Sequence, residues 1–301
     1  MTGAVLTALF FAGNAVCARR AALHYGGTTG NFLRLLLAAA LLGAWAHAAG
    51  AGLGGGAFGW FLLSGAVGFG LGGLTMFHAL PRIGSNLAML IVQCGSAVAA
   101  ALLEWLWLGA RLSAAQAALA ALTLVGVAVG LMGPRGPLPG RRTSGIILAV
   151  LSAAAQGAGA VLSRKAFGVL RIHGFFMDGA SSAYQRVLGG LAVGTLALLV
   201  VRWRPAAEGR SAPEPEAGPA AGLPPWTWVV FNTLLGPVLG VTCYQWALRS
   251  TPAGIVLPIV ATAPLLTVPI ARALEHSRPT PRFWLGALLA VAGAAGLAIV
   301  P

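Results

Sequence analysis

Ten long apolar runs, separated by short polar breaks, make up most of this chain. A helix that crosses a bilayer needs about 20 mostly apolar residues, and most of these runs are near that length. The runs are rich in Ala, Leu and Gly, and they lack the period-two alternation of a membrane strand. The pattern therefore predicts an all-α integral membrane protein with ten transmembrane helices. The predicted helices are 2–18, 29–48, 57–80, 84–107, 113–133, 144–163, 175–201, 226–248, 252–274 and 282–300.

The pattern of the first half recurs in the second half. Ala79–Leu80, which ends one apolar run, matches Ala247–Leu248 at a spacing of 168 residues, and Gly126 matches Gly293 at a spacing of 167. Such a repeat in an apolar chain is typical of a duplicated membrane bundle, and an odd number of helices per half inverts one half relative to the other. We expect a first five-helix repeat over 1–134, a basic connecting loop over 135–143, and a second five-helix repeat over 144–301 that includes a flexible loop at 202–225.

Composition supports a membrane location. Hydrophobic residues make up 58% of the chain and charged residues only 8%, whereas a soluble domain carries roughly a quarter charged residues. The net charge of +13 comes mostly from Lys and Arg between the apolar runs, where such residues flank membrane spans, so a nucleic-acid partner is not expected. Cys17, Cys94 and Cys243 lie far apart within apolar runs and are expected to be free buried thiols.

The arginines between the runs also bear on orientation. Most of them fall in the loops after the odd-numbered predicted helices. Taken alone, the positive-inside rule would place these loops in the cytoplasm and both chain termini outside.

Several motifs, spread over both halves of the chain, resemble those of one transporter family. Phe11–Val16 resembles a Trp-Gly-Ser/Asn opening, and Phe32–Leu37 resembles a Phe-Arg-Leu-Leu-Leu second helix. Tyr184–Leu188 is the counterpart of that second helix in the second repeat, and Leu108–Ser113 resembles a Leu-Gly-Glu-Arg-Leu-Thr turn. The chain is similar to the drug/metabolite transporter superfamily, specifically to ten-helix transporters with two EamA-type repeats.

Two departures from the family pattern concern the turn motif. Ala110 stands where the family has an acid, and in the second version, Arg278–Pro281, Ser277 stands at the acidic position with Glu275 displaced by two residues. These departures weaken any role for the turn and leave the fold assignment unchanged. The resemblance implies both termini in the cytoplasm, in contrast to the charge count, and a bacterial inner membrane.

Polar side chains in the middle of the predicted helices are the candidate substrate-binding residues. Such groups are costly in hydrocarbon and usually face the bundle interior or a cavity. The alternative is interhelical hydrogen bonding, worth about 0.6–2 kcal/mol per bond. Ser96 shares this setting, and the residues that we select for substrate binding are Asn14, His78, Gln93, Gln156, Tyr244, Gln245, Trp246 and Thr262.

Charged residues within the runs are few. Arg34 and Arg186 occupy matching places in the two repeats, and either could bind a substrate carboxylate. The interpretation we favour is that they snorkel to the interface or bind backbone carbonyls. None of the six acids lies at a helix centre, which argues against antiport of protons and organic cations. His78 is the one titratable group other than arginine that could lie deep enough to sense pH, although a packing role is favoured.

Proline and glycine patterns point to helix breaks and close packing. Pro252, Pro258, Pro264 and Pro269 interrupt the ninth predicted helix, and broken helices often line substrate sites in transporters. Gly68–Gly73 matches the Gly-x-Gly-x-x-Gly dinucleotide pattern but follows no strand, so close helix packing is the better explanation. We therefore expect neither a bound cofactor nor an ATP-driven motor.

The sequence therefore predicts a secondary transporter rather than an enzyme. By resemblance, it would move a small organic metabolite, an amino acid or related compound, outward by alternating access, with a coupling proton or none. A nucleotide-sugar or drug transporter of the same superfamily is the first alternative and would show a strongly basic or wholly aromatic cavity. A membrane-embedded enzyme would need clustered catalytic groups, but the five histidines are scattered. A scaffold protein would have no cavity.

Overall fold

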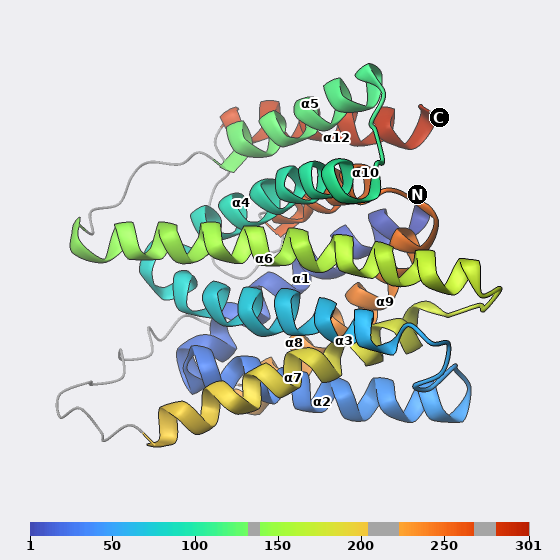
Figure 1. The fold of residues 1–301 in the computed structure, drawn as a ribbon. Helices are drawn as coiled ribbons and strands as arrows, with labels where there is room; N and C mark the ends of the chain where they lie inside the picture. The colour runs from blue at the N-terminus through green and yellow to red at the C-terminus, as the bar shows by residue number, and fades with distance from the viewer. Residues whose placement is uncertain (132–138, 204–222, 268–280, 301) are drawn as a thin grey trace.

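The chain folds into a bundle of long antiparallel helices (Figure 1). The structure is a computed structural model, and it describes residues 1–131, 139–203, 223–267 and 281–300. In the described part of the chain all regular elements are helical. They are α1 (Thr2–Tyr25), α2 (Gly27–Ala48), α3 (Phe58–Gly65), the π-helix η1 (Ala66–Leu71), α4 (Gly72–Leu108), α5 (Ala114–Leu131), α6 (Pro139–Ile172), α7 (Gly179–Trp203), α8 (Pro225–Thr233), the π-helix η2 (Leu234–Val238), α9 (Leu239–Ser250), α10 (Ala253–Val260) and α12 (Pro281–Ile299).

Eight helical segments among the described residues are long and apolar enough to cross a membrane. Two shorter apolar helices, Ala114–Gly130 and Ala253–Thr267, correspond to the fifth and ninth predicted helices. Together they confirm the predicted all-α, ten-helix membrane fold. The eight longer spans are Thr2–Tyr25, Gly27–Ala48, Phe58–Leu80, Leu87–Leu108, Arg142–Ile172, Gly179–Val201, Pro225–Ser250 and Pro281–Ile299.

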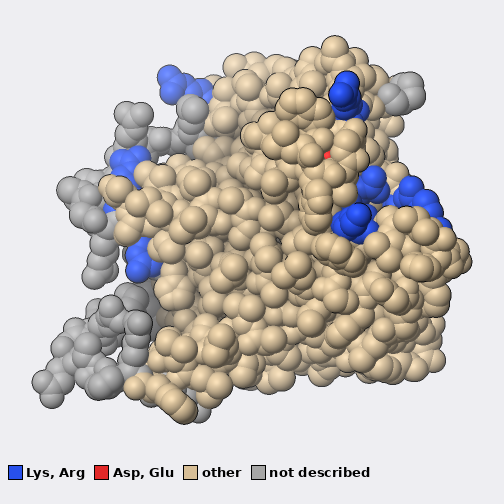
Figure 2. All heavy atoms as spheres, viewed as in Figure 1, with Lys and Arg blue, Asp and Glu red and all other residues tan. Residues whose placement is uncertain are grey.

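Helices from the two halves of the chain pack against each other throughout the bundle. The most extensive contact joins α4 to α6, and α5 pairs with α12, α2 with α7, and α1 with α8 and α9. Both termini lie at the same end of the bundle, as an even number of crossings requires (Figure 1). Lys and Arg side chains gather at the two ends on the face seen in Figure 2 and leave a broad uncharged band between them, as a bilayer requires.

The repeat extends to an unusual backbone feature. Both π-helices occur at equivalent places, since η1 begins at Ala66 and η2 begins at Leu234, the same spacing of 168 that relates Ala79 to Ala247. Single-turn π segments widen a helix locally and occur frequently at functional sites. Two such segments at the predicted repeat spacing show that each half distorts its third helix in the same place.

The helices extend beyond two of the predicted apolar runs. The first run was predicted to end at residue 18, but α1 continues to Tyr25 and includes Arg20, whose guanidinium lies 4.7 Å from the Trp228 ring centroid. The sixth was predicted to end at 163, but α6 continues to Ile172. Arg164, predicted to lie in a loop, is therefore helical. These cations find partners in the bundle, so the helix does not have to end where hydropathy falls.

Proline breaks the ninth predicted helix, as expected. Helix α10 ends at Val260, a turn follows at 261–262, and helical backbone resumes over 263–267. Pro264 has no backbone N–H to donate to Val260, which is the bond that a continuous helix would need there. Pro269 lies outside the described residues, as do 132–138, most of the 202–225 loop, and the second turn motif with Glu275 and Ser277.

Close packing accounts for the glycines of the 68–73 segment. A Cβ on Gly70 would lie 2.6 Å from the Cβ of Val193, and one on Gly159 would lie 3.0 Å from the Cα of Gly68. Both distances are shorter than a normal contact, so η1 approaches α6 and α7 only because these positions carry no side chain.

A capping interaction fixes the start of α7, which carries Arg186. The Asp178 carboxylate precedes the helix and accepts a hydrogen bond from the backbone N–H of Ser181 at 2.8 Å. Burial raises the pKa of the Asp178 carboxyl, but hydrogen bonds from Ser181 and from neighbouring backbone amides outweigh it, so the pKa lies below its ordinary value. Ser181 Oγ also accepts the Ala51 N–H at 2.9 Å, which ties the 49–57 loop to α7.

Candidate functional site

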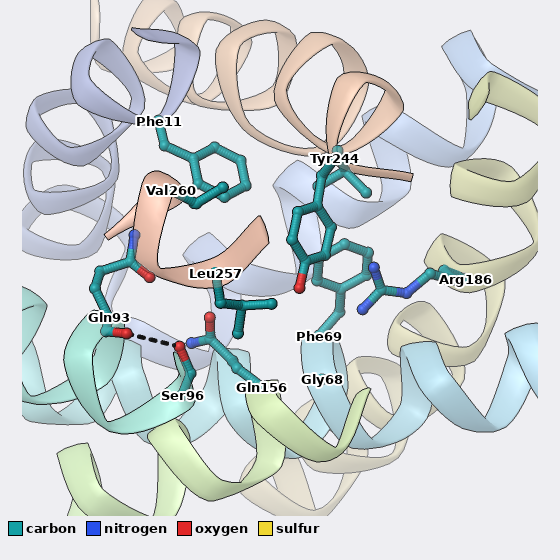
Figure 3. A pocket seen from close by; sticks show the side chains of 11 residues that line it. Phe11, Gly68, Phe69, Gln93, Ser96, Gln156, Arg186, Tyr244, Leu257 and Val260 are labelled. Carbon is teal, nitrogen blue, oxygen red and sulfur yellow. Dashed lines mark hydrogen bonds between the residues drawn. The ribbon is translucent and has the colours of Figure 1, made fainter. Parts of the chain in front are cut away.

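A cavity lies inside the bundle, between helices of both halves (Figure 3). Its volume is about 50 Å³, which is room for a few water molecules. The first half supplies residues from α1, η1 and α4, and the second half supplies residues from α6, α7, α9 and α10. The lining residues are Phe11, Gly68, Phe69, Gln93, Ser96, Gln156, Arg186, Val241, Tyr244, Leu257 and Val260.

Uncharged hydrogen-bonding groups gather on one side of the cavity, where α4 faces α6. The Ser96 hydroxyl donates to the Gln93 backbone carbonyl at 3.0 Å (Figure 3). The Gln156 amide nitrogen donates to Ser152 Oγ at 3.0 Å, and it also lies 3.8 Å from Met76 Sδ. Since Ser152 Oγ in turn donates to the Gly72 carbonyl at 2.7 Å, the Gln156 side chain is held in place from behind.

Arg186 brings a positive charge to the opposite side. The residue is only 3% exposed, and its guanidinium carbon lies 4.7 Å from the Phe69 ring centroid and 5.8 Å from that of Tyr244. Its Nη1 donates to Gln245 Oε1 at 3.0 Å, while its Nε has no hydrogen-bond partner. Among the described residues that line the cavity, Arg186 is the only one with a formal charge.

Two glycines allow Arg186 to reach this position. A Cβ on Gly65 would lie 1.6 Å from the Arg186 carbonyl oxygen, so α3 crosses α7 in direct backbone contact. A Cβ on Gly68 would lie 3.1 Å from Arg186 Nη2, so the bare π-helix leaves room for the guanidinium. The distorted third helix therefore shapes the charged side of the cavity.

The structure contradicts the interpretation favoured for the arginines, that they snorkel to the interface or bind backbone carbonyls, since both donate to side-chain amides within the bundle. Arg186 points into the bundle (Figure 3), because Gln245 and two aromatic rings hold it there. Arg34, its equivalent in the first half, is 9% exposed and lies with its guanidinium carbon 4.8 Å from the Phe77 ring centroid. Arg34 Nε donates to Asn31 Oδ1 of the same helix at 3.0 Å, and Arg34 does not line the cavity.

Three of the predicted substrate-binding residues line the cavity: Gln93, Gln156 and Tyr244. Gln245 lies behind it, fully buried, and contacts it through Arg186. Trp246, the next residue, is 50% exposed and faces away from the bundle interior.

The other three predicted residues lie elsewhere. Asn14 of α1 faces η2, since a Cβ on Gly236 would lie 2.8 Å from Asn14 Oδ1. His78 bonds through Nδ1 to the Leu74 carbonyl at 2.8 Å, and Thr262 donates to the Ile259 carbonyl at 2.7 Å beside the break after α10. None of these three residues lines the cavity, so substrate binding by them stays a prediction.

Apolar lining residues had no signal in the sequence, because Phe11, Phe69, Leu257 and Val260 look like any other residue of a membrane helix. Ser96 and Arg186 were visible as polar positions within apolar runs. The signal that could have placed Arg186 in the cavity is the glycine-rich segment around Gly68, which predicts an unusually close approach of another helix.

A network of charged side chains joins four helices beyond the cavity. Arg164 Nε donates to Glu104 Oε1 at 2.9 Å, and Arg164 Nη1 donates to the Leu248 carbonyl at 2.8 Å. Glu104 Oε2 accepts the Gly254 N–H at 3.2 Å. Glu104 is 2% exposed, so this one ion pair ties α4, α6, α9 and the start of α10 together.

The fold and cavity define a polytopic α-helical membrane protein with a small chamber between its two halves, lined by both polar and apolar side chains. The family model of the EamA-like transporter family matches residues 1–132 and 143–299. The chain belongs to this family, which confirms the resemblance drawn from the motifs and the two-repeat fold. Family membership indicates a small-molecule transporter, not an enzyme, in a membrane.

Solved structures support the same fold. One crystal structure, described only as that of a protein, is similar to this chain with a TM-score of 0.69 and 19% identity, and the match covers 98% of this chain and 95% of the other. At this identity the likeness concerns the fold alone. A search of curated proteins finds no match.

Proposed function

We propose that this protein is a secondary transporter that moves a small organic metabolite, an amino acid or related compound, outward across a bacterial inner membrane by alternating access. The observation that carries the proposal is the cavity itself, a chamber inside the bundle that is lined by a few polar groups among apolar side chains, with walls from both halves of an EamA-family chain. Secondary transporters built from inverted repeats bind their substrates at such an interface, near the bilayer midplane.

The composition of the lining favours a small metabolite over the first alternative. It holds one arginine, two amides, one hydroxyl from serine and three aromatic rings, so it is neither strongly basic nor wholly aromatic. A few placed hydrogen-bonding groups among apolar side chains are the usual mix for a small ligand. A scaffold protein would not need such a chamber.

The cavity is too small for a whole substrate in this conformation. A cavity of about 50 Å³ is far below the roughly 300 Å³ of an ordinary ligand pocket, so a substrate can enter only when helices move. The broken segment after α10 supplies a place to bend, since Leu257 and Val260 line the cavity directly before the break.

Counterflow in proteoliposomes tests the proposal. Vesicles that contain the purified protein are loaded with one unlabelled metabolite and diluted into its labelled form, over a panel of amino acids and related compounds. The proposal predicts protein-dependent accumulation of at least one compound above that of protein-free vesicles. Accumulation of none of the panel would contradict it.

A further inference from the structure

We infer that the cavity recognises a carboxylate, and that Arg186 is the residue that binds it. This inference rests on the proposed transport function and names its substrate class: small metabolites whose carboxylate faces Arg186 and whose remaining polar groups hydrogen-bond to the opposite side of the cavity. The starting observation is the buried charge of Arg186, which no carboxylate among the described residues neutralises.

Arg186 has no carboxylate partner in the described part of the chain. Of the two acids there, Glu104 is bonded to Arg164 and Asp178 to Ser181. A buried cation is costly without a counter-charge. Arg186 Nε is buried without a hydrogen-bond partner, and Nη2 lies beside Gly68, which lines the cavity, so Nη2 is the donor that an incoming anion can reach.

The guanidinium is nevertheless held in a fixed orientation. Gln245 Oε1 accepts Nη1 at 3.0 Å, the Phe69 ring lies 4.7 Å from the guanidinium carbon, and Gly68 leaves space beside Nη2. A planar guanidinium held this way matches the geometry of a carboxylate and gains strength from its charge-assisted hydrogen bonds.

The opposite side of the cavity suits the rest of such a molecule. Gln93, Ser96 and Gln156 face Arg186 across the space that Leu257 and Tyr244 border (Figure 3). These groups can both donate and accept hydrogen bonds, so they suit an amino, hydroxyl or keto group. The arrangement places charge at one end, neutral polarity at the other, and apolar contact between.

The repeat gives an internal comparison. Arg34 corresponds to Arg186, and Phe77 lies 168 residues before Gln245, so each half packs an arginine of its second helix against the same position of its third. In the first half this partner is an aromatic ring and the arginine lies outside the cavity lining. At this position only the second copy has an amide, and it orients the guanidinium toward the chamber, whereas Arg34 donates to Asn31 of its own helix, which makes Arg34 a matched control.

Binding of acids and their amides to the purified protein in detergent tests the inference. The probes are L-leucine with L-leucinamide, lactate with lactamide, and pyruvate with pyruvamide, each titrated while thermal unfolding is followed. We expect at least one acid to stabilise the protein with an apparent affinity at least about tenfold above that of its amide, the usual scale for a hydrogen bond to a charged group. Arg186→Gln should remove this preference, Arg186→Lys should weaken it, and Arg34→Gln should keep it.

Three results would overturn the inference: amides that bind as well as their acids, an acid preference that survives in Arg186→Gln, or no stabilisation of the unsubstituted protein by any of the acids. The comparison of acid with amide uses the unsubstituted protein, so it holds even where a variant fails to fold. Counterflow of the same compounds separates the two proposals. Transport of acids and amides alike would support the transport function and contradict the carboxylate site. Selective binding of acids without transport would support the carboxylate site and contradict the transport function.

Discussion

At the scale of single residues, the cavity depends on how consecutive positions of one helix are directed. Tyr244 lines the cavity, Gln245 lies behind it and bonds to Arg186, and Trp246 faces outward. Each residue of an α-helix is rotated by about 100° from the one before, so three neighbours cannot share one face. Gln245 thus acts on the cavity by holding Arg186.

Replacing Gln245 with Leu should therefore abolish transport while the protein still folds. The leucine fills similar space but leaves Arg186 Nη1 without its acceptor, so the guanidinium loses its fixed orientation. Counterflow in proteoliposomes measures the effect, and size-exclusion chromatography measures folding. Gln116→Leu makes the same chemical change on α5, remote from the cavity, and should transport normally. Unchanged transport in Gln245→Leu would remove Gln245 from the site.

The limits of sequence reasoning are clearest at this scale. Gln93, Gln156 and Tyr244 were identified because polar groups in hydrocarbon need a reason to be there. The same rule cannot say whether an arginine snorkels or points inward. For Arg186 the answer depends on Gly65 and Gly68, which lie on another helix and admit the side chain by having none of their own.

At the scale of elements, the crossing of α3 with α7 positions the charged side of the cavity. Gly65 contacts the Arg186 backbone, and Gly189, about one turn further along α7, contacts the Leu62 carbonyl, where added Cβ atoms would lie 1.6 and 1.9 Å away respectively. Neither backbone can yield without shifting a whole helix. The two glycines therefore set the distance between α3 and α7.

Substituting Gly65 with Ala should destabilise the protein by about 1–3 kcal/mol or more, the usual cost of overpacking, and should also impair transport by displacing Arg186. Gly59→Ala is the matched control on α3, because a Cβ at Gly59 meets nothing within 4 Å. It should be neutral or slightly stabilising, since alanine is favoured over glycine in helices by up to about 1 kcal/mol. Thermal unfolding in detergent distinguishes the two, and equal stability of both variants would contradict this description of the crossing.

The elements themselves were largely predictable from hydropathy, since eight spans and two shorter apolar helices match the ten predicted runs. The ends of helices were not. The fall in hydropathy at Arg164 predicts a loop there. The sequence does not reveal that Glu104 binds Arg164 within the bundle, which allows the helix to continue. The π-helices had no local signal either, although their equal spacing shows that the predicted repeat governs backbone detail as well.

At the scale of the whole molecule, one ion pair fastens the two halves at the end of the bundle. Glu104 of α4 belongs to the first half, and its partners Arg164 and Gly254 belong to the second. Leu248, whose carbonyl accepts a hydrogen bond from Arg164, also belongs to the second half. Removing one member of a buried pair leaves the other charge without compensation, which typically costs about 3–5 kcal/mol.

Glu104→Gln should therefore lower the stability of the protein strongly, by about 3 kcal/mol since Arg164 retains some contact with solvent. The double variant Glu104→Met with Arg164→Met should recover much of the loss, because neither charge then remains. Thermal unfolding of the two single and the double Met variants, beside Glu104→Gln, gives the coupling between the two residues. A Glu104→Gln variant as stable as the unsubstituted protein, or Met substitutions whose effects simply add, would show that the pair does not join the halves.

The central claim is that a water-accessible chamber lies between the two halves inside the membrane. The most direct test is labelling of single cysteines in a background where Cys17, Cys94 and Cys243 are replaced by Ala, with a charged methanethiosulfonate reagent applied to both faces of the membrane. Ser96 and Val98 lie two residues apart on α4, but Ser96 lines the cavity while Val98 is 49% exposed on the outer surface. The account predicts that Ser96→Cys is labelled and Val98→Cys, facing lipid, is not. Labelling of Val98→Cys with Ser96→Cys inert, or failure of both to react, would contradict it.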